Sequence, residues 1–224
     1  MIGEWAPGLW LAQSRFEHTN SGAFACQGAV CLIDPGVYPD EIATWQSAVQ
    51  AHGWTPRALV LTHHDWDHIL GPECFPGVPV VAHAAYLASV DGPEGAPEVD
   101  RWAAREGIAR TTPFAAPQPE RTFEDQTTLI VNVRRLDLIH APGHTADQLV
   151  VYDRAQATLW AGDMLSDREI PLVAHSLVAY QDTLDRLSTL TVRRLIPGHG
   201  QPSAEPREIQ ARLDEDRAYL AELR

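Results

Sequence analysis

Short apolar runs alternate with turn residues through the first part of the chain. The runs at 8–12 and 29–33 predict two strands, and the polar triplet at 20–22 predicts a turn between them. A helix is expected over 41–52, where apolar residues keep helical spacing, with Asp40 as its N-terminal cap. This part of the chain therefore begins as strands that lead into a helix.

The alternation of apolar runs and turn residues continues towards the C-terminus. Further strands are predicted at 58–62, 78–82, 128–133, 135–139, 148–152, 157–160 and 194–196, and helices at 84–90, 180–190 and 205–223. The order of strands, helix, strands and helices predicts an α/β (α+β) domain with two sheets faced by helices. A chain of 224 residues suits one such domain over 1–224.

One segment, at about 91–120, departs from this pattern. It contains five prolines among charged residues, with a helix-like stretch at 99–108 that includes Trp102. The segment is too short for a separate domain and too long for a plain connection. We interpret it as a proline-rich insertion or a lid over a site, and the alternative is a disordered excursion.

Composition narrows the possible partners. The net charge of −13 and the lack of a basic run argue against binding nucleic acid or an anionic membrane. No apolar run is long enough for a membrane helix, and the N-terminal residues do not resemble a secretory signal. The three cysteines lack metal-binding spacing and suit a reducing compartment. We expect a cytoplasmic protein that binds neither nucleic acid nor a membrane, and its oligomeric state stays open.

The segment 62–68, Thr-His-His-Asp-Trp-Asp-His, carries the strongest chemical signal. Alternate side chains of a strand share a face, so His63 and Asp65 are expected to point the same way. Asp67 and His68 would lie at the start of the next helix, turned towards the same place. Crowded imidazoles and carboxylates are costly unless they are paired or bound to a cation. The segment predicts a divalent metal site, and the alternative is a polar loop with surface histidines.

Three further apolar runs also end in residues that can bind metal. They lead into His140-Ala141-Pro142-Gly143-His144, into Gly162-Asp163 and into Pro197-Gly198-His199-Gly200. Binding sites in sheet proteins favour strand ends, where loops converge on a rigid scaffold. Four such endings in one chain are strong evidence for a shared site.

With these motifs the chain resembles the metallo-β-lactamase superfamily, and its glyoxalase II-like hydrolases in particular. The resemblance includes Asn20, the segment 32–36, the block at 62–68 and the three glycine-containing motifs. It implies a four-layer αββα sandwich with two divalent metal ions at one edge. It also implies the following ligands: His63 and His144 for the first metal, Asp67, His68 and His199 for the second, and Asp163 as a bridge.

One position departs from the family pattern, because Asp65 stands where the family has its second histidine. His64 is not an obvious substitute, since neighbouring strand positions face opposite sides. Three aspartates and one hydroxide neutralise two divalent cations, whereas a histidine at 65 would leave a net positive charge. We expect zinc, while the extra carboxylate shifts preference towards manganese or iron.

The resemblance implies hydrolysis of a small ester, thioester, lactone or amide by a metal-bound hydroxide. Asp67 is the expected catalytic residue, which would orient water or accept its proton, and its alternative role is that of a ligand only. Asp34 is expected to brace its turn near the site. His175, Tyr180 and Trp66 are candidates for the substrate pocket, although packing or surface roles are common for such residues.

Two other functions remain open. Asp65 also fits a di-iron redox domain of the flavodiiron type, which carries a carboxylate at this position. No flavodoxin-like or rubredoxin-like partner follows in this chain, which argues against it. The other is a non-catalytic metal-binding module, which six matching family ligands disfavour.

Overall fold

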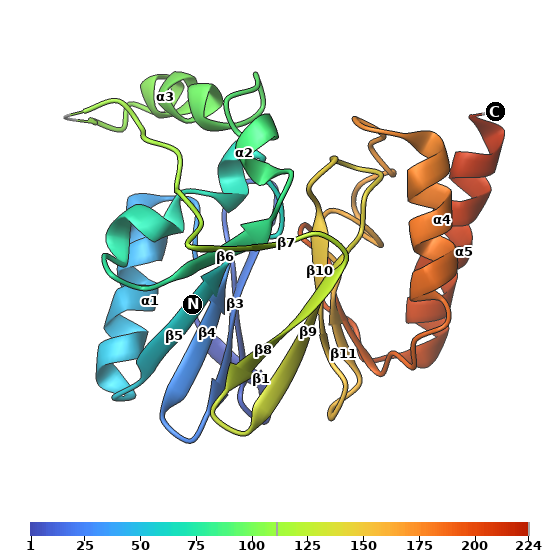
Figure 1. Cartoon of the computed structure of the whole chain (residues 1–224), viewed down its shortest axis with the longest axis horizontal. Coiled ribbons are helices and arrows are strands. Elements are labelled where there is room, and N and C mark those ends of the chain that lie inside the picture. The colour runs from blue at the N-terminus through green and yellow to red at the C-terminus, as the bar shows by residue number, and fades with distance from the viewer. Residues whose placement is uncertain (111, 224) are drawn as a thin grey trace.

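Two β-sheets packed face to face form the centre of the molecule, and helices cover their outer faces (Figure 1). The computed structural model describes residues 1–110 and 112–223. Figure 1 shows α1 outside the first sheet, and α4 and α5 side by side outside the second. This is the four-layer αββα arrangement that the sequence predicts, so the predicted fold class is confirmed.

The first sheet contains seven strands in chain order. They are β1 (Gly3–Ala6), β2 (Leu9–Gln13), β3 (Asn20–Cys26), β4 (Ala29–Ile33), β5 (Thr55–Val60), β6 (Val80–His83) and β7 (Arg121–Phe123). The pairs from β1 to β4 are antiparallel, and those from β4 to β7 are parallel. Helix α1 (Pro39–Ala51) is the crossover that places β5 parallel to β4.

The second sheet has five strands in the order β12-β11-β10-β9-β8. Their bounds are β8 (Gln126–Val131), β9 (Arg134–His140), β10 (Leu149–Asp153), β11 (Thr158–Trp160) and β12 (Arg194–Ile196). Only β11 and β12 pair in parallel, because α4 (Leu177–Leu187) lies between them in the chain; α5 (Pro206–Glu222) follows β12.

Apolar side chains fill three layers. Phe24, Ile33, Val60, Leu138 and Trp160 are fully buried between the sheets. A second cluster lies beneath α1, and a third joins the outer face of the second sheet to α4 and α5. Burial on both faces explains why the central strands read as continuous apolar runs.

Local chemistry at two places differs from the expectation. The triplet at 20–22 begins β3, so the predicted turn there is wrong. Tertiary contacts outweigh the turn propensity of these three residues. Asn20 pairs with Gln13 of the neighbouring strand, and the backbone amide of Asn20 donates to the Gly198 carbonyl. Helix α1 begins at Pro39, and the Glu41 carboxylate accepts from the Tyr38 amide, so Asp40 is not the cap.

The segment at 91–120 lies beyond one end of the first sheet, where its helix packs against the residues at 66–68 (Figure 1). It contains α3 (Ala96–Arg105), which follows the short α2 (Tyr86–Ser89), while residue 111 lies outside the described residues. Buried Trp102 of α3 contacts Trp66, with ring centroids 4.8 Å apart. Across the described ranges, no helix is long and apolar enough to cross a membrane.

Candidate metal centre

Loops that follow strands of both sheets meet at one edge of the sandwich. His63 follows β5, and Asp67 and His68 lie on a short 3-10 helix, Trp66–His68, rather than at the start of an α-helix. The loops after β9, β11 and β12 supply His144, Asp163 and His199, respectively. The structure thus brings together all seven side chains that the sequence singled out, in two neighbouring groups.

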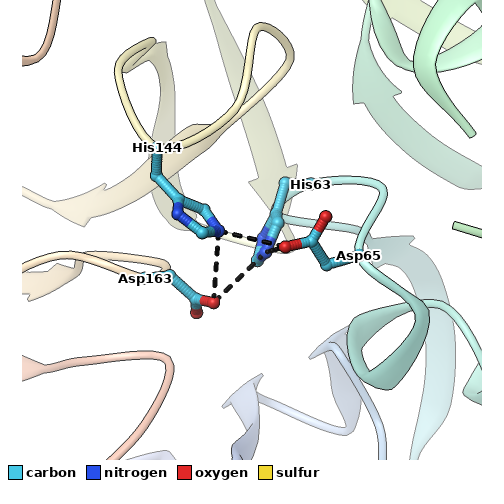
Figure 2. Close-up of side chains that lie close together, drawn as sticks. All are labelled: His63, Asp65, His144 and Asp163. Carbon is cyan, nitrogen blue, oxygen red and sulfur yellow. Dashed lines mark hydrogen bonds and ion pairs between the residues drawn. The ribbon is translucent and has the colours of Figure 1, made fainter. Parts of the chain in front are cut away.

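The first group contains His63, Asp65, His144 and Asp163, whose potential ligand atoms lie within 4.8 Å of one another (Figure 2). Asp65 Oδ2 lies 3.1 Å from His144 Nε2 and 3.5 Å from His63 Nε2. Asp163 Oδ2 lies 3.3 Å from His63 Nε2. Asp65 therefore faces the same point as the two histidines, and His64 is not part of this group.

The second group contains Asp67, His68 and His199. Asp67 Oδ2 lies 3.4 Å from His68 Nε2 and 3.3 Å from His199 Nε2. Asp163 also faces this group, with Oδ1 3.3 Å from His68 Nε2 and Oδ2 3.4 Å from His199 Nε2. Its carboxylate thus lies between the two groups.

Each of the four histidines turns Nε2 inward and holds its outer nitrogen, Nδ1, against an acceptor of the protein. The acceptors are Thr62 Oγ1 for His63, Asp34 Oδ2 for His68, the Leu172 carbonyl for His144 and the Glu17 carbonyl for His199, at 3.0, 3.0, 3.0 and 3.1 Å. Such outer hydrogen bonds fix the tautomer and direct the Nε2 lone pair, as is usual for histidines that bind metal.

The electrostatics of the pocket require positive charge at its centre. Burial lowers the pKa of His63, but Asp163 and Asp65 outweigh that effect and raise it to about 10. The pKa of His199 is raised to about 11 because Asp163 and Asp67 likewise outweigh burial. The pKa of Asp163 is held well below its usual range, although burial opposes this, because the histidines stabilise its charge.

Divalent cations fit this set of donors. The Nε2 atoms of His68 and His199 lie only 3.3 Å apart, and both rings use Nδ1 to donate elsewhere. Two neutral rings in this arrangement would face each other with lone pairs, so a proton or a cation must separate them. Within the described part of the chain, His63 Nε2 and Asp163 Oδ1 are also buried without a hydrogen-bond partner. Imidazole nitrogens with carboxylate oxygens suit zinc, iron or manganese.

A cavity of about 510 Å³ opens onto both groups. Its walls include Phe16, Glu169, Ile170, Leu172 and Tyr180 besides the candidate ligands. The Tyr180 hydroxyl donates to the Asp163 carbonyl at 3.2 Å, so this side chain supports the loop after β11 as well as lining the cavity.

The other candidates for the substrate pocket lie elsewhere. His175 is exposed, and Trp66 is buried between Phe16 and Trp102. Neither residue is among the described residues that line the cavity. The described residues of the 91–120 insertion do not line it either.

Several contributors to the site carry little or no sequence signal. The carbonyls of Glu17 and Leu172 orient histidines, but a backbone acceptor leaves no mark on residue identity. Glu169 lies in the cavity with Oε1 3.8 Å from His199 Nδ1, and burial raises the pKa of its carboxyl. The sequence predicts only that Asp34 braces its turn, yet this residue also accepts from His68.

Comparison with known families agrees with this geometry. The profile of the metallo-beta-lactamase superfamily matches residues 15–199. The chain belongs to this superfamily. Solved members share its fold: a metallo-beta-lactamase from Pontibacter korlensis superposes with a TM-score of 0.72 at 20% identity, covering 99% of this chain and 98% of that one. A metallo-beta-lactamase family protein from Thermus thermophilus gives a TM-score of 0.75 at 24% identity, covering 98% and 81%.

Relatives with similar sequences include proteins named for different activities. Acyl-coenzyme A thioesterase MBLAC2 from Homo sapiens is 30% identical over 86% of this chain and 78% of its own length. The Beta-lactamase-like protein 2 homolog of Drosophila melanogaster is 28% identical over 84% of this chain. A hydroxyacylglutathione hydrolase from Brucella anthropi is 28% identical over 71%. The alignment spans only 60% of the Drosophila protein and 52% of the Brucella protein.

Proposed function

We propose that this protein is a metal-dependent hydrolase with two metal sites that cleaves a small thioester or ester. The observation that carries the proposal is the convergence of four imidazole Nε2 atoms on three carboxylates beneath one open cavity. Burying so many charged and polar side chains is costly, and apolar side chains would stabilise the fold better at these positions. Its position at the cavity floor favours a catalytic role.

Two groups of residues would hold the cations. His63, Asp65 and His144 would bind the first, and Asp67, His68 and His199 the second, with Asp163 shared between them. When bound, divalent cations make water a stronger acid and polarise a carbonyl oxygen, which supplies both the nucleophile and the electrophilic activation for hydrolysis.

Asp67 is the residue that we assign to proton transfer from the attacking water, besides metal binding. Its Oδ2 accepts from the Thr19 hydroxyl at 3.1 Å, and the carboxylate also lines the cavity. The pKa of Asp67 is lowered by His68 and His199, although burial opposes this, so the carboxylate is ionised and can accept a proton.

The substrate class rests on the relatives and the cavity together. The relatives named above include an acyl-coenzyme A thioesterase and a hydroxyacylglutathione hydrolase, and both names denote thioester cleavage. The cavity is large enough for a small molecule and combines Phe16, Ile170 and Leu172 with the polar floor. An acyl group would lie against these apolar side chains with its carbonyl over the metal groups.

Hydrolysis is tested with zinc-loaded protein and acetyl and butyryl thioesters, with the released thiol followed by a chromogenic reagent. We expect turnover that a chelator abolishes and that zinc restores. Asp67→Asn should reduce kcat strongly, whereas His175→Gln, an exposed position outside the cavity, should not change it. Zinc-loaded protein that cleaves neither thioesters nor esters would overturn the proposal.

Metal identity is a separate measurement. Zinc is the proposed metal, but the Asp65 oxygen in the first group is a hard ligand that favours manganese or iron more than a histidine would. Elemental analysis of the purified protein distinguishes these metals. Iron together with a visible absorption band and oxygen consumption would indicate redox chemistry in place of hydrolysis.

A further inference from the structure

The two oxygens of Asp65 face different partners. Oδ2 lies towards His144 and His63, at 3.1 and 3.5 Å from their Nε2 atoms. Oδ1 points away from the metal groups, as Figure 2 shows, and lies 3.5 Å from His64 Nε2. Because a carboxylate rotates readily about its side-chain bonds, a partner at the outer oxygen can limit the orientation of the whole group.

His64 is itself held in place from the other side. Its Nδ1 donates to Asp147 Oδ1 at 2.7 Å, and Asp147 comes from the loop between β9 and β10, 83 residues away in the chain. The Asp147 side chain is fully buried, and its Oδ2 has no hydrogen-bond partner in the described part of the chain. A buried carboxylate is costly without a partner, so the contact with His64 is the interaction that makes this position acceptable.

The contact between His64 and Asp65, at 3.5 Å, is longer than the hydrogen bonds at Nδ1 of the candidate histidine ligands, but it occupies the equivalent outer position on Asp65. A histidine at position 65 would have a second ring nitrogen with which to find an outer acceptor, as the other four rings do. An aspartate instead needs a partner for its outer oxygen, and His64 lies at that oxygen. Outer partners of this kind are needed because they orient the metal-binding atom.

We propose that His64, anchored by Asp147, is a positioning residue that directs the Asp65 carboxylate into the first metal site. The inference rests on the proposed function, because it assumes that the first group binds a cation. It explains why neighbouring residues of the motif have different tasks: Asp65 binds, while His64 acts through Asp65 without binding.

The positioning role of His64 is tested by metal affinity, which is measured independently of turnover. Metal-free protein is titrated with zinc against a chromogenic chelator, which resolves two dissociation constants. We expect His64→Ala to weaken one site by about 10- to 100-fold and to leave the other unchanged, since the pair contacts only the first group. His175→Gln is the matched control, an exposed histidine outside the cavity that should leave both constants unchanged.

A second variant separates positioning from folding. His64→Ala leaves the Asp147 carboxylate buried without its partner, which alone destabilises the loop. In His64→Ala/Asp147→Asn a neutral amide replaces that carboxylate, so the double variant should regain thermal stability but bind zinc as weakly at the first site as the single variant. Restoration of wild-type affinity in the double variant would overturn the inference, because the loss would then come from the buried charge.

The remaining outcomes also discriminate. If wild-type protein binds two zinc ions and His64→Ala changes neither constant, the positioning role is refuted and the proposed function stands. If His64→Ala weakens both sites equally, its effect is not specific to Asp65 and the inference is again refuted. If wild-type protein binds no divalent cation, the proposed function fails together with this inference.

Discussion

The Asp34 carboxylate accepts a hydrogen bond from His68, with Oδ2 3.0 Å from Nδ1, although 34 residues separate them in the chain. Asp34 also accepts from the amide and the hydroxyl of Thr62, at 2.9 and 2.7 Å. The Thr62 hydroxyl in turn accepts from His63 Nδ1. One buried aspartate therefore orients, directly or through Thr62, a histidine of each metal group.

Asp34→Asn is expected to weaken zinc binding because an amide cannot offer two acceptor oxygens to Thr62 and His68. The substitution should retain the fold, since the backbone at 34 has a φ of +42°, which asparagine tolerates. We expect the second site to lose about 10- to 100-fold in affinity. Zinc titration measures this, with exposed Asp185→Asn as the control. An unchanged affinity would show that Asp34 only braces the turn.

Gly198→Ala should disrupt the shared carboxylate. A methyl group at Gly198 would overlap Asp163 Oδ1 and would lie 3.0 Å from the Gly162 backbone, so Asp163 must move. Because Asp163 faces both groups, zinc affinity should fall at both sites, together with any hydrolytic activity. Gly3→Ala, where no atom lies within 4 Å of the added methyl, is the matched control. Equal zinc binding by Gly198→Ala and wild type would contradict the shared role of Asp163.

The grouping of the candidate ligands was predictable because each follows an apolar run that ends at a sheet edge. The apolar run at 58–61 marks the end of β5. The histidines and aspartates that follow it are too polar to continue a buried strand, so the sequence predicts that they gather in a polar site. The same reasoning explains why the layered fold was predictable, since runs of residues buried on both faces identify central strands.

Other features depend on contacts that no local pattern encodes. The triplet at 20–22 has turn-forming residues, but the contact between Asn20 and Gly198 makes it part of a strand. Trp66 stands between Asp65 and Asp67 in the sequence, yet its side chain packs against Trp102 of α3 and not against the site. His64 and Asp147 meet only because β5 and β9 belong to sheets that pack together, so the sequence shows two unrelated polar residues.

Metal binding at neutral pH should release protons from the protein. In the metal-free state the pKa of His63 is raised to about 10 and that of His199 to about 11, chiefly because Asp163 outweighs burial in each case. The pKa of His68 is also raised well above its usual range. His63 and at least one of the facing His68 and His199 rings carry a proton on Nε2 at pH 7, and a cation that binds Nε2 must displace it.

We therefore expect release of about two to three protons per protein at pH 7 on saturation with zinc, falling as the pH rises through 10 and 11. Calorimetric titration in buffers of different ionisation enthalpy counts the protons. His63→Gln should reduce the count by about one, and His175→Gln should not change it. Zinc binding with no proton release would show that the rings are neutral before metal arrives.

The final prediction concerns Asp216 of α5, a buried residue at the cavity wall whose Oδ2 accepts from the Leu165 amide at 3.0 Å. Burial raises the pKa of its carboxyl from 3.8 to about 6, although the Leu165 amide opposes this. A raised folded-state pKa means that the folded protein binds the proton more tightly than the unfolded chain. The stabilising effect is complete below pH 3.8 and is lost as the pH rises through 6.

Asp216→Asn should remove this dependence while keeping an acceptor for Leu165. Between about pH 4 and pH 6.5 the free energy of unfolding of the wild type should fall relative to the variant by about 2–3 kcal/mol. Chemical denaturation at fixed zinc concentration, followed by circular dichroism, measures the difference. If the two proteins keep a constant difference across this range, Asp216 is ionised in the folded state at every pH tested, and burial does not control its charge.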